Sequence, residues 1–228
     1  HDVGECERGV FLAMELVDGM TLTDLIRSGQ PMSTRDVVEI GIQLTRALDY
    51  AHKKGIVHRD IKPGNIMLVS SGNQVKVTDF GICRIDGSDH ELTQHTQLGD
   101  VLGTPNYMSP EQVLGQKVDS RSDLFSVGVV LYKLVTGALP FPGTELGDII
   151  IRVWNDPHPT PSEIAPDLPR SLDAFFARAL AKSADDRFQS APELAAAFAE
   201  AAGIAVPSIS SPFDPRGSLS SSPLVGSP

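Results

Sequence analysis

A short loop in the first half of the chain gathers side chains that can do chemistry. The run His58-Arg59-Asp60-Ile61-Lys62-Pro63-Gly64-Asn65 holds an acid, a lysine and an amide. Proline and glycine favour a tight turn, so one loop can hold these side chains at a single point. Asp79 supplies a second carboxylate after a short strand-like hairpin. Because oxygen ligands of this kind prefer hard cations, the set suits Mg²⁺ and phosphate groups.

Asp60, Lys62, Asn65 and Asp79 meet the needs of phosphoryl transfer, which depends on positioning and charge neutralisation. Asp60 is the candidate base for an attacking hydroxyl, and Lys62 could steady the transferred phosphate. Asn65 and Asp79 could offer oxygen ligands to Mg²⁺. Each residue alone has an ordinary interpretation, as a solvated ion pair or as a turn residue. Their order and the D-x-x-x-x-N spacing of Asp60 and Asn65 favour the functional interpretation through a family resemblance that is described below.

The elements that must position this loop follow from the spacing of apolar residues. Ser33-Thr34-Arg35-Asp36 opens a long helix with the spacing of a capping box, and Gly55 ends it. Residues 66–69 and 75–77 flank Ser71-Gly72-Asn73 and predict a β-hairpin. The loop therefore lies between a rigid helix and a hairpin. The apolar positions that recur at helical spacing in the long helix are Val37, Ile40, Leu44, Ala47, Leu48 and Ala51.

The remaining pattern predicts a mostly helical domain with a strand at its front. Residues 10–16 predict a buried strand, and residues 204–228, rich in Ser and Pro, predict a disordered tail. Residues 124–135 are so apolar that their helix must be buried nearly all round. The other predicted helices lie at 21–27, 146–154, 171–180 and 191–202.

Composition limits the classes of function. The chain has 228 residues, 41% of them hydrophobic, which is enough for a substantial core. Its net charge of −10 argues against an extended nucleic-acid partner. Cys6 and Cys83 show no metal-like spacing and no disulfide framework, so we expect a reducing, cytoplasmic location. The chain has no apolar run of the roughly 20 residues that a membrane span needs.

Two sets of residues resemble the motifs of eukaryotic-type serine/threonine protein kinases. The loop at residues 58–65 and Asp79-Phe80-Gly81 resemble the catalytic and metal-binding loops of that family. Gly103 to Glu111 resembles the substrate-binding segment and its closing Ala-Pro-Glu motif, with Ser109 in the place of Ala. Pro-Gly-Asn and Ser-Pro-Glu-Gln look most like bacterial members.

The resemblance implies an α+β, protein kinase-like fold, mainly the α-helical C-terminal lobe with a remnant of the N-lobe sheet. Residues 1–20 would form the remnant strand and hinge, residues 21–203 the C-terminal lobe, and residues 204–228 the disordered tail. The implied cofactors are ATP and Mg²⁺, and the implied partners are proteins with Ser or Thr acceptors. In many bacterial members a flexible segment leads on to a membrane helix, and the tail fits such a linker.

The resemblance also assigns roles to residues around the loop. His58 would brace the loop against Phe80, and Asp123 would anchor it from below. Arg59 would receive a phosphate from the polar segment that follows Asp79. The other implied roles concern phosphorylation (Thr93 and Thr96), substrate choice (Thr104 with Lys62), a buried ion pair (Glu111 with Arg187) and the adenine pocket (Met14, Glu15, Val17 and Met67).

The same resemblance exposes a gap at the front of the chain. No two glycines are two residues apart, so a G-x-G-x-x-G phosphate loop is absent, and no lysine follows a suitable buried strand. We therefore expect a truncated kinase whose isolated chain is inactive, because the cover over the phosphates is missing. The alternative is a non-catalytic kinase-like module that docks partners. Retention of Asp60, Lys62, Asn65 and Asp79 argues against it.

Overall fold

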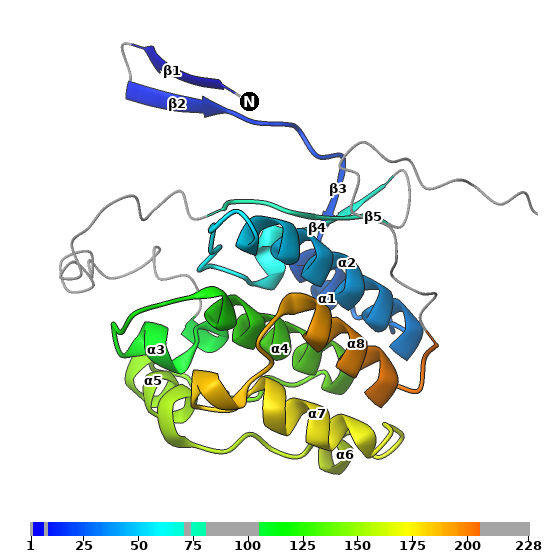
Figure 1. Ribbon diagram of the computed structural model, residues 1–228. Coiled ribbons are helices and arrows are strands. Elements are labelled where there is room, and N and C mark those ends of the chain that lie inside the picture. The colour runs from blue at the N-terminus through cyan, green and yellow to red at the C-terminus, as the bar shows by residue number, and fades with distance from the viewer. Residues whose placement is uncertain (1, 7–8, 71–73, 81–104, 206–228) are drawn as a thin grey trace, which may run out of the picture.

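Helices form the body of the molecule and short strands lie on one side of it (Figure 1). The computed structural model describes residues 2–6, 9–70, 74–80 and 105–205. The strands are β1 (Asp2–Cys6), β2 (Gly9–Ala13), β3 (Gly19–Thr21), β4 (Ile66–Val69) and β5 (Gln74–Val77). The helices are α1 (Leu22–Ser28), α2 (Thr34–His52), α3 (Pro110–Val113), α4 (Ser120–Thr136), α5 (Leu146–Asn155), α6 (Pro161–Ile164), α7 (Ser171–Ala179) and α8 (Ala191–Ala201). Short 3₁₀ turns lie at Pro63–Asn65, Pro105–Tyr107 and Ala184–Asp186.

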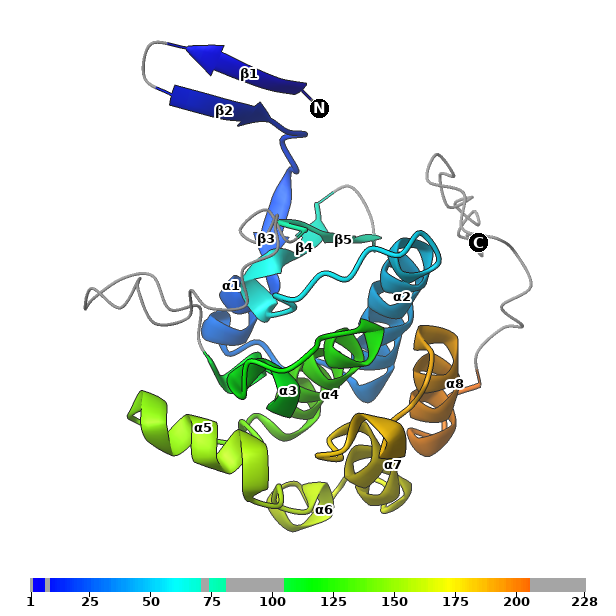
Figure 2. The same cartoon turned by 60° about the vertical axis from the view of Figure 1, so that its left-hand side comes forward.

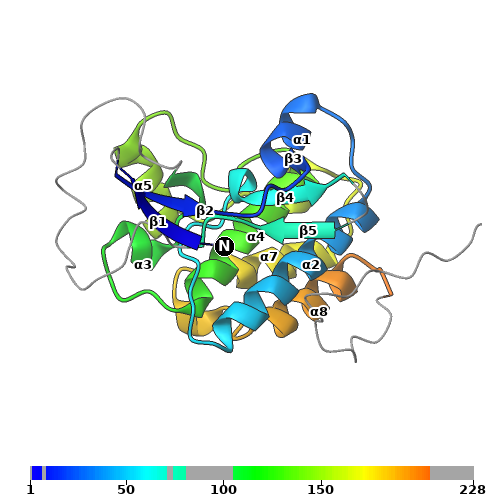
Figure 3. The ribbon, with the colours of Figure 1, turned by 90° about the horizontal axis from the view of Figure 1, so that it is seen from above.

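The strands form two antiparallel sheets. β1 pairs with β2 in a hairpin that stands apart from the helices (Figure 2). β3, β4 and β5 form the second sheet in that order, and Met67 lies opposite both Thr21 and Lys76. Seen from above, β4 and β5 lie between α1 and α2 (Figure 3). The β4–β5 hairpin thus occupies the predicted position directly after the loop.

The predicted buried strand at residues 10–16 is wrong in its burial and its bounds. Strand β2 ends at Ala13, and the side chains that follow are open to solvent. Phe11 is 50% exposed, Met14 55% and Leu16 95%. The physical reason is that β2 pairs only with β1 among the described strands, so the apolar residues find no layer to pack against.

Helix α2 begins and is oriented as its sequence predicts. The Ser33 hydroxyl accepts the Asp36 backbone N–H, and the Asp36 carboxylate accepts the Ser33 backbone N–H. This reciprocal capping box satisfies amides that a helix start leaves unpaired. Its apolar stripe faces the core, where Val37, Leu44 and Leu48 are at most 1% exposed. The C-terminal end of α2 therefore delivers the chain to the loop from a fixed position.

Helix α4 is the centre of the lobe. Every residue from Ser122 to Tyr132 is buried, as the apolar run at 124–135 predicts. Asp119 caps its start by accepting the Arg121 backbone N–H, and Gly137 ends it with a φ of 73°. Helices α2 and α7 pack against it, and α8 packs against α2 and α7 in turn (Figures 1 and 2). No helix among the described residues is long and apolar enough to cross a membrane.

Candidate active site

The buried carboxylate of Asp123 holds the start of the loop. Asp123 is 1% exposed and lies in the first turn of α4. Its Oδ2 accepts the His58 backbone N–H at 2.8 Å, and its Oδ1 accepts the Arg59 N–H at 2.8 Å. The Nε2 of His52, at the end of α2, lies 2.7 Å from Oδ2. A single acid from the central helix thus fixes two consecutive amides of the loop.

His58 connects the loop to the strand that precedes Asp79. Its ring is buried, and its Nε2 lies 2.9 Å from the Thr78 carbonyl oxygen. Its Nδ1 accepts the Asp60 backbone N–H at 3.2 Å. Because a carbonyl only accepts, the ring hydrogen must be on Nε2. The ring also lies against Phe80, with centroids 4.6 Å apart, which is the bracing arrangement that the resemblance implies.

Two polar side chains of the loop converge on the carboxylate of a third. Oδ2 of Asp60 accepts a hydrogen bond from Lys62 Nζ at 2.7 Å and another from Asn65 Nδ2 at 2.9 Å. Asn65 Nδ2 also donates to the Asp60 backbone carbonyl at 2.8 Å. Asn65 is buried in the 3₁₀ turn, whereas the Asp60 side chain is 48% exposed. The loop therefore presents an oriented carboxylate to solvent.

Asp79 reaches the same place from the β4–β5 hairpin. The backbone N–H of Thr78 donates to the Asn65 carbonyl at 2.9 Å, which puts Asp79 one residue from the loop. Asp79 is exposed and has a φ of 59°, an uncommon conformation for a residue with a Cβ. Such strain persists only where the surroundings enforce it. The structure thus joins Asp60, Lys62 and Asn65 by hydrogen bonds and places the backbone of Asp79 beside their loop.

Arg59 has a similarly strained backbone. Its φ is 67°, and both of its backbone polar groups are bound by side chains. Asp123 accepts its N–H, and Nε2 of Gln112, in α3, donates to its carbonyl oxygen at 2.7 Å. The conformation of Arg59 decides the direction in which the chain enters Asp60. Its side chain is exposed, as a phosphate-binding role requires.

Glu111 and Arg187 form a buried ion pair below the loop. Arg187 is 1% exposed, and its two terminal nitrogens each donate to one carboxylate oxygen of Glu111 at 2.8 Å. Ser122 donates to the same carboxylate at 2.5 Å. Burial by itself would raise the pKa of Glu111, but the bonds from Arg187 and Ser122 outweigh it and lower the pKa. This pair fixes α3 to the chain that precedes α8.

The predicted adenine-binding residues come from two segments of the chain. Met14, Glu15 and Val17 belong to the connection between β2 and β3, and Met67 lies in β4. An ion pair joins Glu15 to Lys76, and Lys76 lies opposite Met67 in the β4–β5 register. The connection is therefore tied to β5, the strand that pairs with the strand of Met67.

Thr93, Thr96 and Thr104 lie outside the described residues. The described chain resumes at Pro105, where the turn Pro105–Tyr107 is held to α4 by Ser126, whose hydroxyl donates to the Tyr107 carbonyl at 2.7 Å. The two regulatory threonines and the predicted substrate-binding threonine therefore remain predictions from the sequence.

Sequence reasoning missed Gln112, His52 and Lys76. Gln112 binds the backbone carbonyl of Arg59, and His52 binds Asp123, which is distant in the sequence. The pattern of residues around a polar side chain in a helix does not predict such a partner. Lys76 binds Glu15, which lies 61 positions earlier, so no local pattern predicts that pair.

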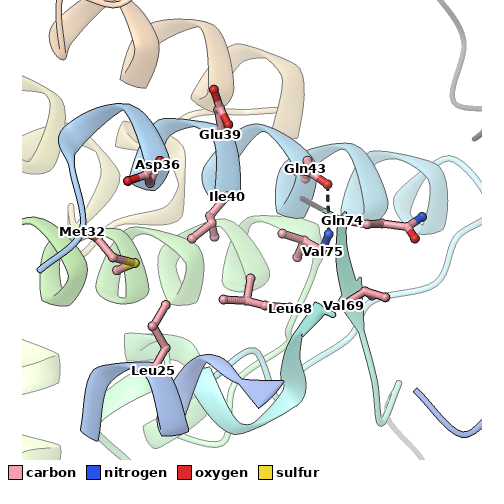
Figure 4. A pocket seen from close by; sticks show the side chains of 10 residues that line it. All are labelled: Leu25, Met32, Asp36, Glu39, Ile40, Gln43, Leu68, Val69, Gln74 and Val75. Carbon is pink, nitrogen blue, oxygen red and sulfur yellow. Dashed lines mark hydrogen bonds between the residues drawn. The ribbon is translucent and has the colours of Figure 1, made fainter. Parts of the chain in front are cut away.

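A separate cavity of about 210 Å³ lies between α1, α2 and the β4–β5 hairpin (Figure 4). The Val75 backbone N–H donates to Gln43 Oε1 at 2.9 Å along one wall. None of the residues predicted for catalysis lines it, so it is separate from the candidate site. Its lining consists of Leu25, Met32, Asp36, Glu39, Ile40, Gln43, Leu68, Val69, Gln74 and Val75.

The comparison with known families agrees with this geometry. The family model described as "Protein kinase domain" matches residues 1–198. The chain belongs to the protein kinase family. Among solved structures it is similar to the kinase domain of PknI from Mycobacterium tuberculosis, with a TM-score of 0.68, 32% identity, 89% of this chain and 70% of that chain covered. The predicted α+β kinase-like fold is therefore confirmed.

The curated relatives are bacterial serine/threonine protein kinases. A probable PknB of Bifidobacterium longum is 43% identical over 190 residues, which cover 83% of this chain and 27% of that protein. The PknB of Mycobacterium leprae is 42% identical over 201 residues, with 86% of this chain and 32% of that protein covered. The chain thus spans about a third of these kinases. The predicted likeness to bacterial members of the family is confirmed.

Proposed function

We propose that this chain is the catalytic lobe of a kinase that transfers the γ-phosphate of ATP to Ser or Thr hydroxyls of proteins. The observation that carries the proposal is the convergence of Lys62 and Asn65 on the Asp60 carboxylate, beside Asp79. Such a constellation has no role in packing, since Asp60 and Asp79 are both exposed. It matches the positioning and charge neutralisation that phosphoryl transfer requires.

In this proposal Asp60 is the base. Its Oδ2 is occupied by Lys62 and Asn65, so Oδ1 accepts the hydrogen bond from the substrate hydroxyl and then its proton. Lys62 carries a positive charge beside that carboxylate, where it also neutralises charge on the transferred phosphate. The strained backbone at Arg59 sets the direction of Asp60. These residues orient the acceptor and hold its proton.

Asn65 and Asp79 fit a magnesium ion. Since Asn65 Nδ2 donates to Asp60, the carbonyl oxygen Oδ1 of the same amide is the metal-facing atom. Asp79 adds a carboxylate, and two oxygen donors with water and phosphate oxygens suit Mg²⁺. When bound with ATP, the ion neutralises phosphate charge during transfer.

The nucleotide base would rest on Met67, with the backbone of Glu15 and Val17 along its edge and Met14 behind it. Glu15 uses its side chain to bind Lys76, so its backbone carbonyl is the group that remains for the adenine. Kinase relatives of this chain are several times longer, and we propose that an N-terminal lobe completes the phosphate cover. We expect the 228 residues alone to lack transfer activity, and we propose a cytoplasmic location for the lobe.

The test is an Asp60→Asn substitution in the natural polypeptide that contains this chain. We expect ATP-dependent phosphorylation of a Ser/Thr protein substrate to fall by about 10²-fold or more, with little change in ATP affinity. Asp49→Asn is the matched control, because Asp49 lies in α2, outside the loop, and its carboxylate forms an ion pair with the exposed Lys53. Equal activity of both variants would exclude Asp60 as the base.

The alternative is a docking module without catalysis. It predicts that the natural polypeptide binds its partners equally well with Asp60→Asn and shows no phosphate transfer in any variant. A radiolabelled ATP assay with the unmodified polypeptide separates the two functions directly.

A further inference from the structure

The side chain of Gln112 connects two segments that the catalytic proposal treats separately. Its Nε2 donates to the Arg59 carbonyl at 2.7 Å, in the loop. Its Oε1 accepts the backbone N–H of Ser109 at 3.0 Å and the Ser109 hydroxyl at 3.1 Å. The amide is thus held at both ends, and its orientation is fixed because Ser109 N–H only donates and the Arg59 carbonyl only accepts.

The place of Gln112 makes this connection rigid. It is 8% exposed and lies in α3, next to Glu111, which the buried Arg187 holds by two bonds. Helix α3 is joined to the first turn of α4 by the hydrogen bond from Ser122 to Glu111. Asp123 of α4 accepts the Arg59 N–H, while Gln112 of α3 binds the Arg59 carbonyl. Side chains from two helices therefore bind both the backbone N–H and the backbone carbonyl of Arg59.

We infer that Gln112 is a positioning residue for phosphate transfer, which holds Arg59 in its left-handed conformation and so aims Asp60. The inference rests on the proposed role of Asp60 as the base. At a φ of 67° Arg59 is in a conformation that residues with a Cβ avoid, so its bonds must maintain it. Asp60 is the next residue, so the backbone conformation of Arg59 sets the direction of the Asp60 carboxylate. Gln112 also transmits the position of the segment that ends at Ser109 to the catalytic loop.

The capping role of Gln112 is separable from this positioning role. Ser109 and Gln112 form a capping box. The glutamine oxygen accepts the Ser109 backbone N–H, and the Ser109 hydroxyl accepts the Gln112 backbone N–H at 3.4 Å. Glutamate serves equally well in such a box. A Gln112→Glu substitution therefore keeps the cap and the size of the side chain, but it places an oxygen where the Arg59 carbonyl needs a donor.

Amide hydrogen exchange in this chain tests whether the hydrogen bond from Gln112 stabilises the backbone of Arg59, and it does not depend on catalysis. In Gln112→Glu we expect exchange of the Arg59 and Asp60 amides to quicken by about tenfold, the effect of one lost hydrogen bond. The Val113 amide, which donates to the Ser109 carbonyl, should stay protected. The control is Gln116→Glu, the same chemical change at an exposed position four residues on. Unchanged exchange at Arg59 and Asp60 would overturn the inference.

Kinetics of the natural polypeptide test the consequence. We expect Gln112→Glu to lower kcat by about tenfold with the KM for ATP unchanged, and Gln116→Glu to change neither. Gln112→Met removes both the donor and the capping oxygen but adds no charge, and it should lower kcat in the same way. If the glutamate variant does not fold, unchanged exchange of the Arg59 and Asp60 amides in Gln112→Met would overturn the inference. Faster exchange with unaltered kcat would refute the positioning role. Absence of transfer in the unmodified polypeptide would refute the proposed function instead, and leave the exchange result as the test of the hydrogen bond from Gln112.

Discussion

Glu111→Gln is expected to lower the free energy of unfolding by about 3 kcal/mol. The substitution leaves the guanidinium of Arg187, 1% exposed, without its counter-charge. Removing one partner of a buried pair costs about 3–5 kcal/mol in general. The lower end applies here because Arg187 keeps the carbonyls of Ala181 at 2.7 Å and Lys182 at 2.8 Å. The glutamine oxygen can also accept one of its two former bonds.

Urea unfolding of this chain, followed by far-ultraviolet circular dichroism, measures the loss. The companion variants are Arg187→Met and the double substitution. Because the two side chains form one hydrogen-bonded unit, the double variant should lose about 2 kcal/mol less than the sum of the singles. A cost below about 1 kcal/mol for Glu111→Gln, or strict additivity, would refute the view that the pair holds α3 in place. Glu163→Gln, at an exposed position of α6, is the control for the chemical change.

Other consequences concern acid stability and helix packing. The pKa of Glu111 in the folded protein lies below its ordinary value of 4.5. Its carboxylate therefore stabilises the fold fully above pH 4.5, and this stabilisation is lost as the pH falls through the folded pKa. In an acid titration, the free energy of unfolding of Glu111→Gln should decline less steeply than that of the unmodified chain. Gly128→Val should cost about 2 kcal/mol in urea unfolding, because a Cβ there would lie 3.1 Å from Leu180 and 3.3 Å from Ala179. Gly147→Ala meets no atom within 4 Å and should stabilise α5 by about 0.5 kcal/mol.

Local chemistry made the helices and the loop predictable. Ser33 and Asp36 specify the start of α2 through reciprocal bonds over four residues, and Gly137 ends α4 because its φ of 73° suits glycine. The apolar run of α4 could only be buried. The D-x-x-x-x-N spacing placed Asp60 and Asn65 in contact, since a 3₁₀ turn at Pro63 closes that distance.

Features that depend on a partner distant in the sequence could not be predicted from local patterns. Strand β3 is only three residues long and exists because β4 pairs with it from residues 67–69. Its first residue, Gly19, reads as a turn when it is considered alone. Gln112 likewise binds a backbone carbonyl 53 positions earlier. A carbonyl belongs to every residue type, so no sequence pattern could identify that partner.

The contact between α2 and α8 has a consequence for the synthesis of the chain. Gly41 of α2 is buried, and a Cβ added there would lie 3.4 Å from Phe198 of α8. Ribosomes release α2 long before α8. The part of α2 that packs against α8 therefore stays uncovered until almost the entire lobe has emerged. During that interval it is open to chaperones and to other nascent chains. A ribosome that stalls before residue 198 would release a product with this face uncovered, which marks it for degradation or aggregation.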